Sequence, residues 1–169
     1  MSILQIVEVP NSILRKEAKK IVDFNEDLVK LAEDMAETMY TAPGVGLAAN
    51  QVAVLKQIVV VDTTPKDEPK NLLVLINPEI VEEEGVEELE EGCLSLPDFK
   101  QEVERAEKIK VRAHNLKGES IVLEAEGMLA RAIQHEMDHI HGWLLLDYSN
   151  PIKRELYIRK RKKLAKKSS

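Results

Sequence analysis

The segment QHEMDHIHG at residues 134–142 constrains the fold of this chain more than any other, because it contains the metal-binding pattern H-E-x-x-H. In a helix, successive residues turn by about 100°, so His135 and His139 lie about 40° apart on one face. Three apolar side chains lie about 140° to 200° from His135, on the opposite face: Ile133, Met137 and Ile140. The fold must therefore bury one side of this helix and open the other side to a cavity that both imidazoles and Glu136 can reach.

Two histidines do not complete the coordination of a metal, and the same segment offers three ways to complete it. His141 lies about 240° around the helix from His135, so it points away. Asp138 lies about 60° from the same line and suits a hydrogen bond that orients an imidazole. Gly142 extends the match toward the metzincin peptidases, whose third histidine would fall at residue 145, which is Leu145. A third ligand must therefore come from elsewhere in the chain.

The chain contains one cysteine, Cys93, in the segment EGCLSLP. A single cysteine excludes an intrachain disulfide, which suits a reducing cytosol. Such a residue can be a buried apolar side chain or a reactive or metal-binding thiol. Beside a histidine pair that lacks a ligand, the second interpretation is favoured. A thiolate and two imidazoles suit Zn²⁺ by their chemistry and leave one position open for water.

The rest of the sequence predicts helices at both ends of the chain and strands between them. Helical spacing of apolar residues predicts an amphipathic helix from Asn25 that ends before Pro43, with Asp23 and Glu26 as a capping box. Strands are expected at residues 57–63 and 72–84, a turn at Gly85 back into residues 86–97, and a hairpin of residues 108–115 and 119–126.

A second helix is expected from about Met128 to His141, and a third begins at Asn150 and Pro151 and enters a basic tail. This order predicts an α+β fold, with mainly antiparallel sheets around a central metal-binding helix. The acidic run Glu82–Glu91 is expected to be an exposed hairpin in which only Glu91 matters for function.

Length and charge limit the possible classes of protein. At 169 residues and 44% hydrophobic, the chain is expected to form one domain over residues 1–169. The net charge is −6, but residues 153–169 hold nine Lys or Arg and one Glu, which gives +8 and leaves −14 for residues 1–152. No apolar run reaches about 18 residues and the start does not resemble a signal peptide, so no membrane span and a cytoplasmic location are expected.

Three segments together resemble the peptide deformylases of the bacterial type: GVGLAANQ at Gly44–Gln51, EGCLS at Glu91–Ser95 and QHEMDH at Gln134–His139. The resemblance follows the whole chain in order and spacing. It implies an enzyme that removes the formyl group from the N-terminal formylmethionine of new polypeptides and releases formate. It also implies one divalent metal held by Cys93, His135 and His139, natively Fe²⁺, with Zn²⁺, Ni²⁺ or Co²⁺ also able to bind.

The resemblance implies a role for each residue around the metal. Metal-bound water attacks the formyl carbon while Glu136 takes its proton as general base and then gives it to the leaving amine as general acid. The side-chain amide of Gln51 and the backbone N–H of Leu94 donate to the oxyanion.

The same resemblance implies where the substrate lies. N-formylmethionyl peptides and nascent chains would bind as an added strand, with Val45, Gly46 and Gly92 as backbone partners. The helix geometry places Met128 and Ala132 on the face of His135, so they could wall an apolar pocket for methionine, although such residues are more often ordinary core. In the family this pocket also includes the positions of Val45, Leu89, Leu94 and His135. The sequence departs from the family pattern at Arg131, usually apolar, and Lys100, often arginine.

Two other functions fit parts of the sequence. A general zinc peptidase would share the helix but would take a His or Glu as its third ligand. A ribosome- or RNA-binding module could be built on the basic tail, which is otherwise a solvated helix face. Combined with the deformylase resemblance, the tail is a candidate docking element for ribosomal RNA, and nothing indicates specific DNA binding.

Overall fold

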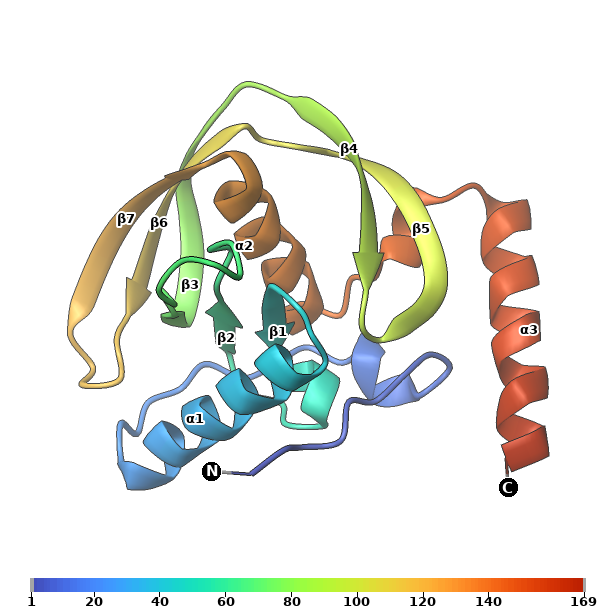
Figure 1. Ribbon diagram of the computed structural model, residues 1–169, viewed down its shortest axis with the longest axis horizontal. Coiled ribbons are helices and arrows are strands. Elements are labelled where there is room, and N and C mark those ends of the chain that lie inside the picture. Colours follow the sequence, from blue (N-terminus) through green and yellow to red (C-terminus); the bar gives the residue numbers. More distant parts are fainter. Residues whose placement is uncertain (1, 169) are drawn as a thin grey trace.

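The computed structural model describes residues 2–168 as a mixed fold of helices and antiparallel sheets (Figure 1), the class that the sequence predicts. Three short 3₁₀ turns, at Ser12–Arg15, Ala49–Val52 and Leu145–Tyr148, connect the main elements. In chain order these elements are α1 (Glu26–Thr41), β1 (Gly46–Ala48), β2 (Ile58–Val61), β3 (Leu73–Glu84), β4 (Glu87–Cys93), β5 (Leu96–Arg105), β6 (Lys108–His114), β7 (Ser120–Glu126), α2 (Gly127–Ile140) and α3 (Pro151–Ser168).

The larger sheet has the strand order β1-β2-β3-β6-β7, and every pair in it is antiparallel. All four residues of β2 are buried, because the sheet is covered on both faces where β2 lies. Val59 and Val61 belong to the core that contains the apolar stripe of α2. Ile58 and Val60 belong to the core that contains the apolar face of α1. Alternate residues of one continuous apolar strand thus face two different helices.

The helix α2 carries both histidines of the H-E-x-x-H segment, and its Ile133, Met137 and Ile140 are buried in the core beneath the larger sheet. Figure 1 shows α2 between β3, β6 and β7 on one side and β4 and β5 on the other. The outer surface of the β4–β5 pair then contacts α3, through Tyr157, whose hydroxyl donates to the carbonyl of Pro97 at 2.7 Å. The helix α2 therefore lies between two sheets that do not share a strand.

The predicted hairpin at residues 108–126 is confirmed as β6 and β7, with Lys108 opposite Glu126 and His114 opposite Ser120. The predicted turn back at Gly85 is wrong. There the chain leaves the larger sheet, since β3 pairs with β6 while β4 pairs with β5. A hairpin at Gly85 would give the glutamates of β3 no basic partners across the strands. In the observed register Glu82 and Glu84 instead lie opposite Lys110 and Lys108.

The strand β5 is absent from the sequence prediction. Its buried residues are Leu96, Phe99, Val103 and Arg105, so apolar residues do not alternate regularly along it. Asp98 has a φ of 63°, which interrupts the extended backbone and shifts the alternation of faces. A pattern of period two could not find this strand.

The N-terminal helix begins close to the predicted residue but with a different cap. Asn25, and not the predicted pair of Asp23 and Glu26, is the N-cap of α1, and its side chain accepts from the N–H of Leu28 at 3.1 Å. Asn150 caps α3 in the same way, through the N–H of Lys153 at 2.8 Å. Among the described residues, no helix combines the length and the apolar character that a membrane span requires.

Candidate metal centre

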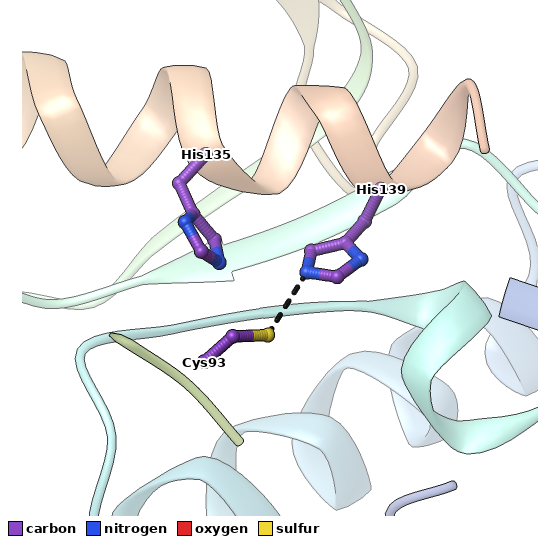
Figure 2. Close-up of side chains that lie close together, drawn as sticks. All are labelled: Cys93, His135 and His139. Carbon is purple, nitrogen blue, oxygen red and sulfur yellow. Dashed lines mark hydrogen bonds between the residues drawn. The ribbon is translucent and has the colours of Figure 1, made fainter. Parts of the chain in front are cut away.

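The three predicted ligands, which are far apart in the sequence, meet in space. Cys93 ends β4, and His135 and His139 lie one turn apart on α2 (Figure 2). The Sγ atom of Cys93 lies 3.2 Å from Nε2 of His139, and the candidate ligand atoms of all three residues lie within 4.8 Å of one another. A thiol and two imidazoles at this spacing match the donor set of a transition-metal site. His141 lies outside the group, where its Nδ1 contacts Oε1 of Glu17 at 2.7 Å near the surface.

The end of β4 carries the thiol toward α2. Along a strand, residues two apart share a face, so Glu91 and Cys93 both point toward the helix while Gly92 between them is exposed. The register of β4 and β5 shifts between Glu91 and Cys93, but the extra residues lie in β5, between Leu96 and Gln101, so the alternation along β4 is kept.

Glu91 orients the first histidine. Its Oε1 lies 2.9 Å from Nδ1 of His135, which leaves Nε2 of that ring for the cluster. The predicted orienting residue, Asp138, does not fill this role. Its Oδ2 instead accepts from Arg105 at 2.7 Å and from the hydroxyl of Tyr148 at 2.6 Å. Helix geometry alone could not anticipate that a strand would bring a second carboxylate to the other side of the imidazole.

The Glu91 carboxylate is buried between two arginines. Arg105 donates to it through Nε at 3.0 Å and through NH2 at 2.9 Å, and Arg131 donates to it through NH1 at 2.5 Å. Burial alone would raise the pKa of Glu91, but the hydrogen bonds from His135 and Arg105 and the charge of Arg105 lower it to about 2. Glu91 therefore remains an anion, able to accept the proton on Nδ1 of His135.

The two histidines differ in their electrostatic surroundings. Burial and the positive charges of His135 and Arg105 hold the pKa of His139 well below its usual range, so its ring stays neutral. Burial also disfavours the charged form of His135, but the negative charge of Glu136 and the hydrogen bonds with Cys93 and Glu91 raise its pKa well above the usual value. The environment that holds a proton on His135 would also favour a metal cation in place of that proton.

Glu136 is buried at the same cavity, and its Oε1 has no hydrogen-bond partner among the described residues. Burial raises its pKa to about 7, against the opposing charges of His135 and Arg105. Its side chain is packed against Gly46, where a Cβ atom would come within 2.6 Å of Oε2. A glycine in the first motif thus makes room for the carboxylate of the third motif, with one oxygen left to accept a proton.

Gln51 approaches the cluster from the other side. Its Oε1 accepts from the N–H of Ala48 at 2.9 Å, which fixes the amide with Nε2 at 3.6 Å from Sγ of Cys93 and 3.2 Å from Oγ of Ser95. Leu94 follows Cys93 directly, and both Gln51 and Leu94 line the cavity beside the cluster.

The cavity has a volume of about 420 Å³, and every residue predicted for substrate binding lines it. The side chains of Val45, Leu89 and Met128 are about half exposed at its rim, and Ala132 is buried. Both β1, at the edge of the larger sheet, and β4, in the two-stranded sheet, border the cavity with a sheet edge that has no strand partner among the described residues. The residues predicted for substrate binding are Val45, Gly46, Leu89, Gly92, Met128 and Ala132.

The bonds from two arginines to Glu91 were not predicted from the sequence, in which Arg105 is not singled out and Arg131 is named only as a departure from the family pattern. Arg105 belongs to the unpredicted strand β5, so no local signal could link it to the cluster. The position of Arg131 could have been inferred from the sequence, because it precedes His135 by four residues and therefore shares its helix face.

Comparisons with known proteins agree with these features. Residues 3–155 match the family model described as Polypeptide deformylase. The chain is 51% identical to a peptide deformylase of Thermodesulfovibrio yellowstonii, over 95% of this chain and 97% of the relative. It is 46% identical to one of Syntrophobacter fumaroxidans, over 100% of this chain and 99% of the relative.

Solved structures give the same result. A peptide deformylase from Legionella pneumophila superimposes with a TM-score of 0.90 at 41% identity, covering 99% of this chain and 98% of that one. A peptide deformylase from Ehrlichia chaffeensis in complex with actinonin superimposes with a TM-score of 0.91 at 37% identity, covering 96% of this chain and 98% of that one.

Proposed function

Because the chain belongs to the polypeptide deformylase family, we propose that it removes the formyl group from the N-terminal formylmethionine of newly made polypeptides and releases formate. The observation that carries this proposal is the meeting of Cys93 with His135 and His139 beside the cavity. A general zinc peptidase would add a third His or a Glu to the two histidines of the helix, whereas the third member of this group is Cys93. We further propose that residues 1–169 act as one domain.

One divalent metal would be held by Sγ of Cys93, Nε2 of His139 and Nε2 of His135. The donor set fits, since a thiolate and two imidazoles suit iron, zinc, nickel and cobalt, and the neutral ring of His139 offers a lone pair. The family resemblance favours Fe²⁺ as the native ion. When bound, such a metal acts as a Lewis acid that lowers the pKa of water in the site toward neutrality.

Glu136 transfers the proton in this proposal. Its unpaired Oε1 accepts a proton from the attacking water as the new C–O bond forms at the formyl carbon. When the C–N bond breaks, Glu136 gives this proton to the amine nitrogen, so the products are formate and a free amino terminus. A carboxyl group with a pKa near 7 is suited to both transfers.

Gln51 and Leu94 would stabilise the oxyanion, through the side-chain Nε2 and the backbone N–H respectively. The amide of Gln51 is preorganised for this, because its oxygen is held by Ala48 and its nitrogen faces the cluster. Donors that are fixed before the reaction stabilise developing charge at little cost in reorganisation.

Replacing Gln51 by leucine should therefore lower kcat by about 10²-fold or more while KM changes little. Steady-state deformylation of a formylated tripeptide measures this. Gln57→Leu is the matched control, because Gln57 is another buried amide whose Nε2 bonds a backbone carbonyl, that of Ala18, away from the cavity. Equal effects of the two substitutions on kcat would argue against the role of Gln51.

The peptide would bind between the free edges of β1 and β4, with the backbones of Val45, Gly46 and Gly92 as partners. Its first side chain would enter the apolar part of the cavity formed by Leu89, Met128 and Ala132.

Three substrates distinguish deformylase from peptidase activity: formyl-Met-Ala-Ser, acetyl-Met-Ala-Ser and Met-Ala-Ser. We expect formate from the first and no cleavage of peptide bonds in any of them. Cleavage of the Met-Ala bond in the unblocked peptide would favour the general peptidase instead.

The basic helix α3 would dock on ribosomal RNA, and the enzyme would act in the cytoplasm near emerging chains. Its lysines project from a helix that is fixed to the body by Tyr157 and by Arg161, whose Nε donates to the carbonyl of Val9 at 3.0 Å.

Changing Lys160, Lys162 and Lys163 together to glutamate should weaken ribosome binding by about tenfold or more at moderate salt, because contacts to phosphates release counterions. Co-sedimentation with ribosomes at several salt concentrations measures this. Lys20, Lys30 and Lys56, changed together to glutamate, are the matched control on the exposed body. Binding that is insensitive to salt, or unaffected by the α3 substitutions, would contradict the docking role.

A further inference from the structure

Arg131 is a buried arginine that reaches from α2 to both strands of the β4–β5 sheet. It is 5% exposed and lies one turn before His135 on the same face of the helix. Its NH2 donates to the carbonyl of Glu87 on β4 at 2.6 Å, and its NH1 donates to the carbonyl of Val103 on β5 at 2.9 Å. NH1 also donates to Oε2 of Glu91 at 2.5 Å. One guanidinium thus joins three elements.

Arg131 supplies one of the four hydrogen bonds that the Glu91 carboxylate makes, two at each oxygen. Its Oε1 faces Nδ1 of His135 and accepts from NH2 of Arg105. Its Oε2 accepts from Nε of Arg105 and from NH1 of Arg131. Without Arg131, Oε2 would lose one of its two donors, and the carboxylate could tilt away from His135.

The candidate ligands are divided between two elements that belong to different parts of the fold. Cys93 ends β4, which pairs only with β5 among the described strands, while both histidines lie on α2. Among the described residues, the side chains of Arg131 and His135 supply the hydrogen bonds that join α2 to β4, in addition to the contact of Cys93 with His139. These bonds, together with the bond from Arg105 of β5 to Asp138 of α2, hold the strand of the thiol against the helix of the imidazoles.

We propose that Arg131 is a positioning residue of the metal centre, which holds Glu91 against His135 and fixes β4 against α2 before the metal binds. This inference rests on the proposed metal site. The side chain also lines the cavity proposed for the substrate. Partners that orient a ligand typically change metal affinity by about 10- to 100-fold when they are lost.

A purely structural role would give a different result, and Arg161 provides the comparison. Arg161 is also mostly buried, and it also bonds one backbone carbonyl, that of Val9, and one carboxylate, that of Glu8 at 2.8 Å. It fixes α3 to the N-terminal segment and does not line the cavity. Arg131→Met and Arg161→Met therefore remove the same kind of interaction at sites near to and far from the cluster.

The test is the rate at which Ni²⁺-loaded protein releases its metal to an excess of chelator. We expect Arg131→Met to release nickel about tenfold faster than the wild type or more, and Arg161→Met to stay within about twofold of it. In a Glu91→Gln background, Arg131→Met should add less than about twofold, because Arg131 acts through Glu91.

Equal nickel release rates for Arg131→Met and Arg161→Met would overturn the proposal. So would a double variant, Arg131→Met with Glu91→Gln, whose release rate is raised by the product of the two single effects. If Arg131→Met does not fold, Arg131→Lys is compared with Arg161→Lys. Lysine keeps the charge but cannot reach three acceptors with a planar fork, so faster release is again expected only at residue 131. A wild-type protein that binds no nickel would instead refute the proposed metal centre.

Discussion

Replacing Glu136 by glutamine should lower kcat/KM for deformylation by about 10³-fold or more while leaving the metal content unchanged. A single general acid–base group typically contributes about 10²- to 10⁴-fold, and Glu136 is proposed to act in both proton transfers. Glutamine has nearly the same shape, so it fits beside Gly46 in the space that the carboxylate occupies, but it cannot accept the proton.

The measurement is steady-state formate release together with metal analysis of the same samples. Glu90→Gln is the matched control, because Glu90 is another glutamate that lines the cavity but is exposed and lies outside the cluster. We expect that control to stay within about threefold of the wild type, as for most surface substitutions. A Glu136→Gln enzyme with more than about a tenth of the wild-type rate would rule out Glu136 as the base.

Replacing Cys93 by serine should weaken metal binding by about 100-fold or more, and activity should fall with it. Losing a thiolate ligand should lower metal affinity by more than the roughly 10- to 100-fold that is typical for losing a residue that only hydrogen-bonds to a ligand. Serine keeps the size of the side chain, so the β4–β5 turn and the packing around it should be preserved. Equilibrium dialysis against Ni²⁺ or Zn²⁺ gives the affinity directly.

His141→Asn is the control for Cys93→Ser. His141 lies in the same motif segment and looks like a ligand in the sequence, but in the structure it contacts Glu17 away from the cluster. Its replacement should leave the metal affinity unchanged. If Cys93→Ser bound metal as tightly as the wild type, the third ligand would have to be another residue, as in a general peptidase.

The parts of the site that follow the periodicity of one helix could be predicted from the sequence. Helix geometry predicts that His135 and His139 share a face, that Ile133, Met137 and Ile140 form the opposite buried face, and that His141 points away. The three family motifs predict which distant residues accompany them. Each of these inferences needs only the regular turn of one helix or the order of short segments.

The pairing of the strands, and their contacts with α2, could not be predicted from the sequence. The departure of the chain from the larger sheet at Gly85 and the irregular strand β5 decide that Glu91 and Arg105 lie against α2. Helix geometry therefore favours Asp138, three residues after His135, whereas Glu91, 44 residues before His135, is the carboxylate that bonds it. Register across a sheet depends on long-range contacts that no local pattern encodes.

The most direct test of the proposed function is formate release from formyl-Met-Ala-Ser by wild-type protein that has been loaded with Fe²⁺ under anaerobic conditions. Metal content is determined on the same sample, and folding is verified by circular dichroism. We expect catalytic turnover with one formate and one free amino terminus for each peptide consumed, and loss of turnover when the metal is removed by a chelator. A folded protein carrying one metal ion per chain that releases no formate would contradict the assignment of this site as a deformylase centre.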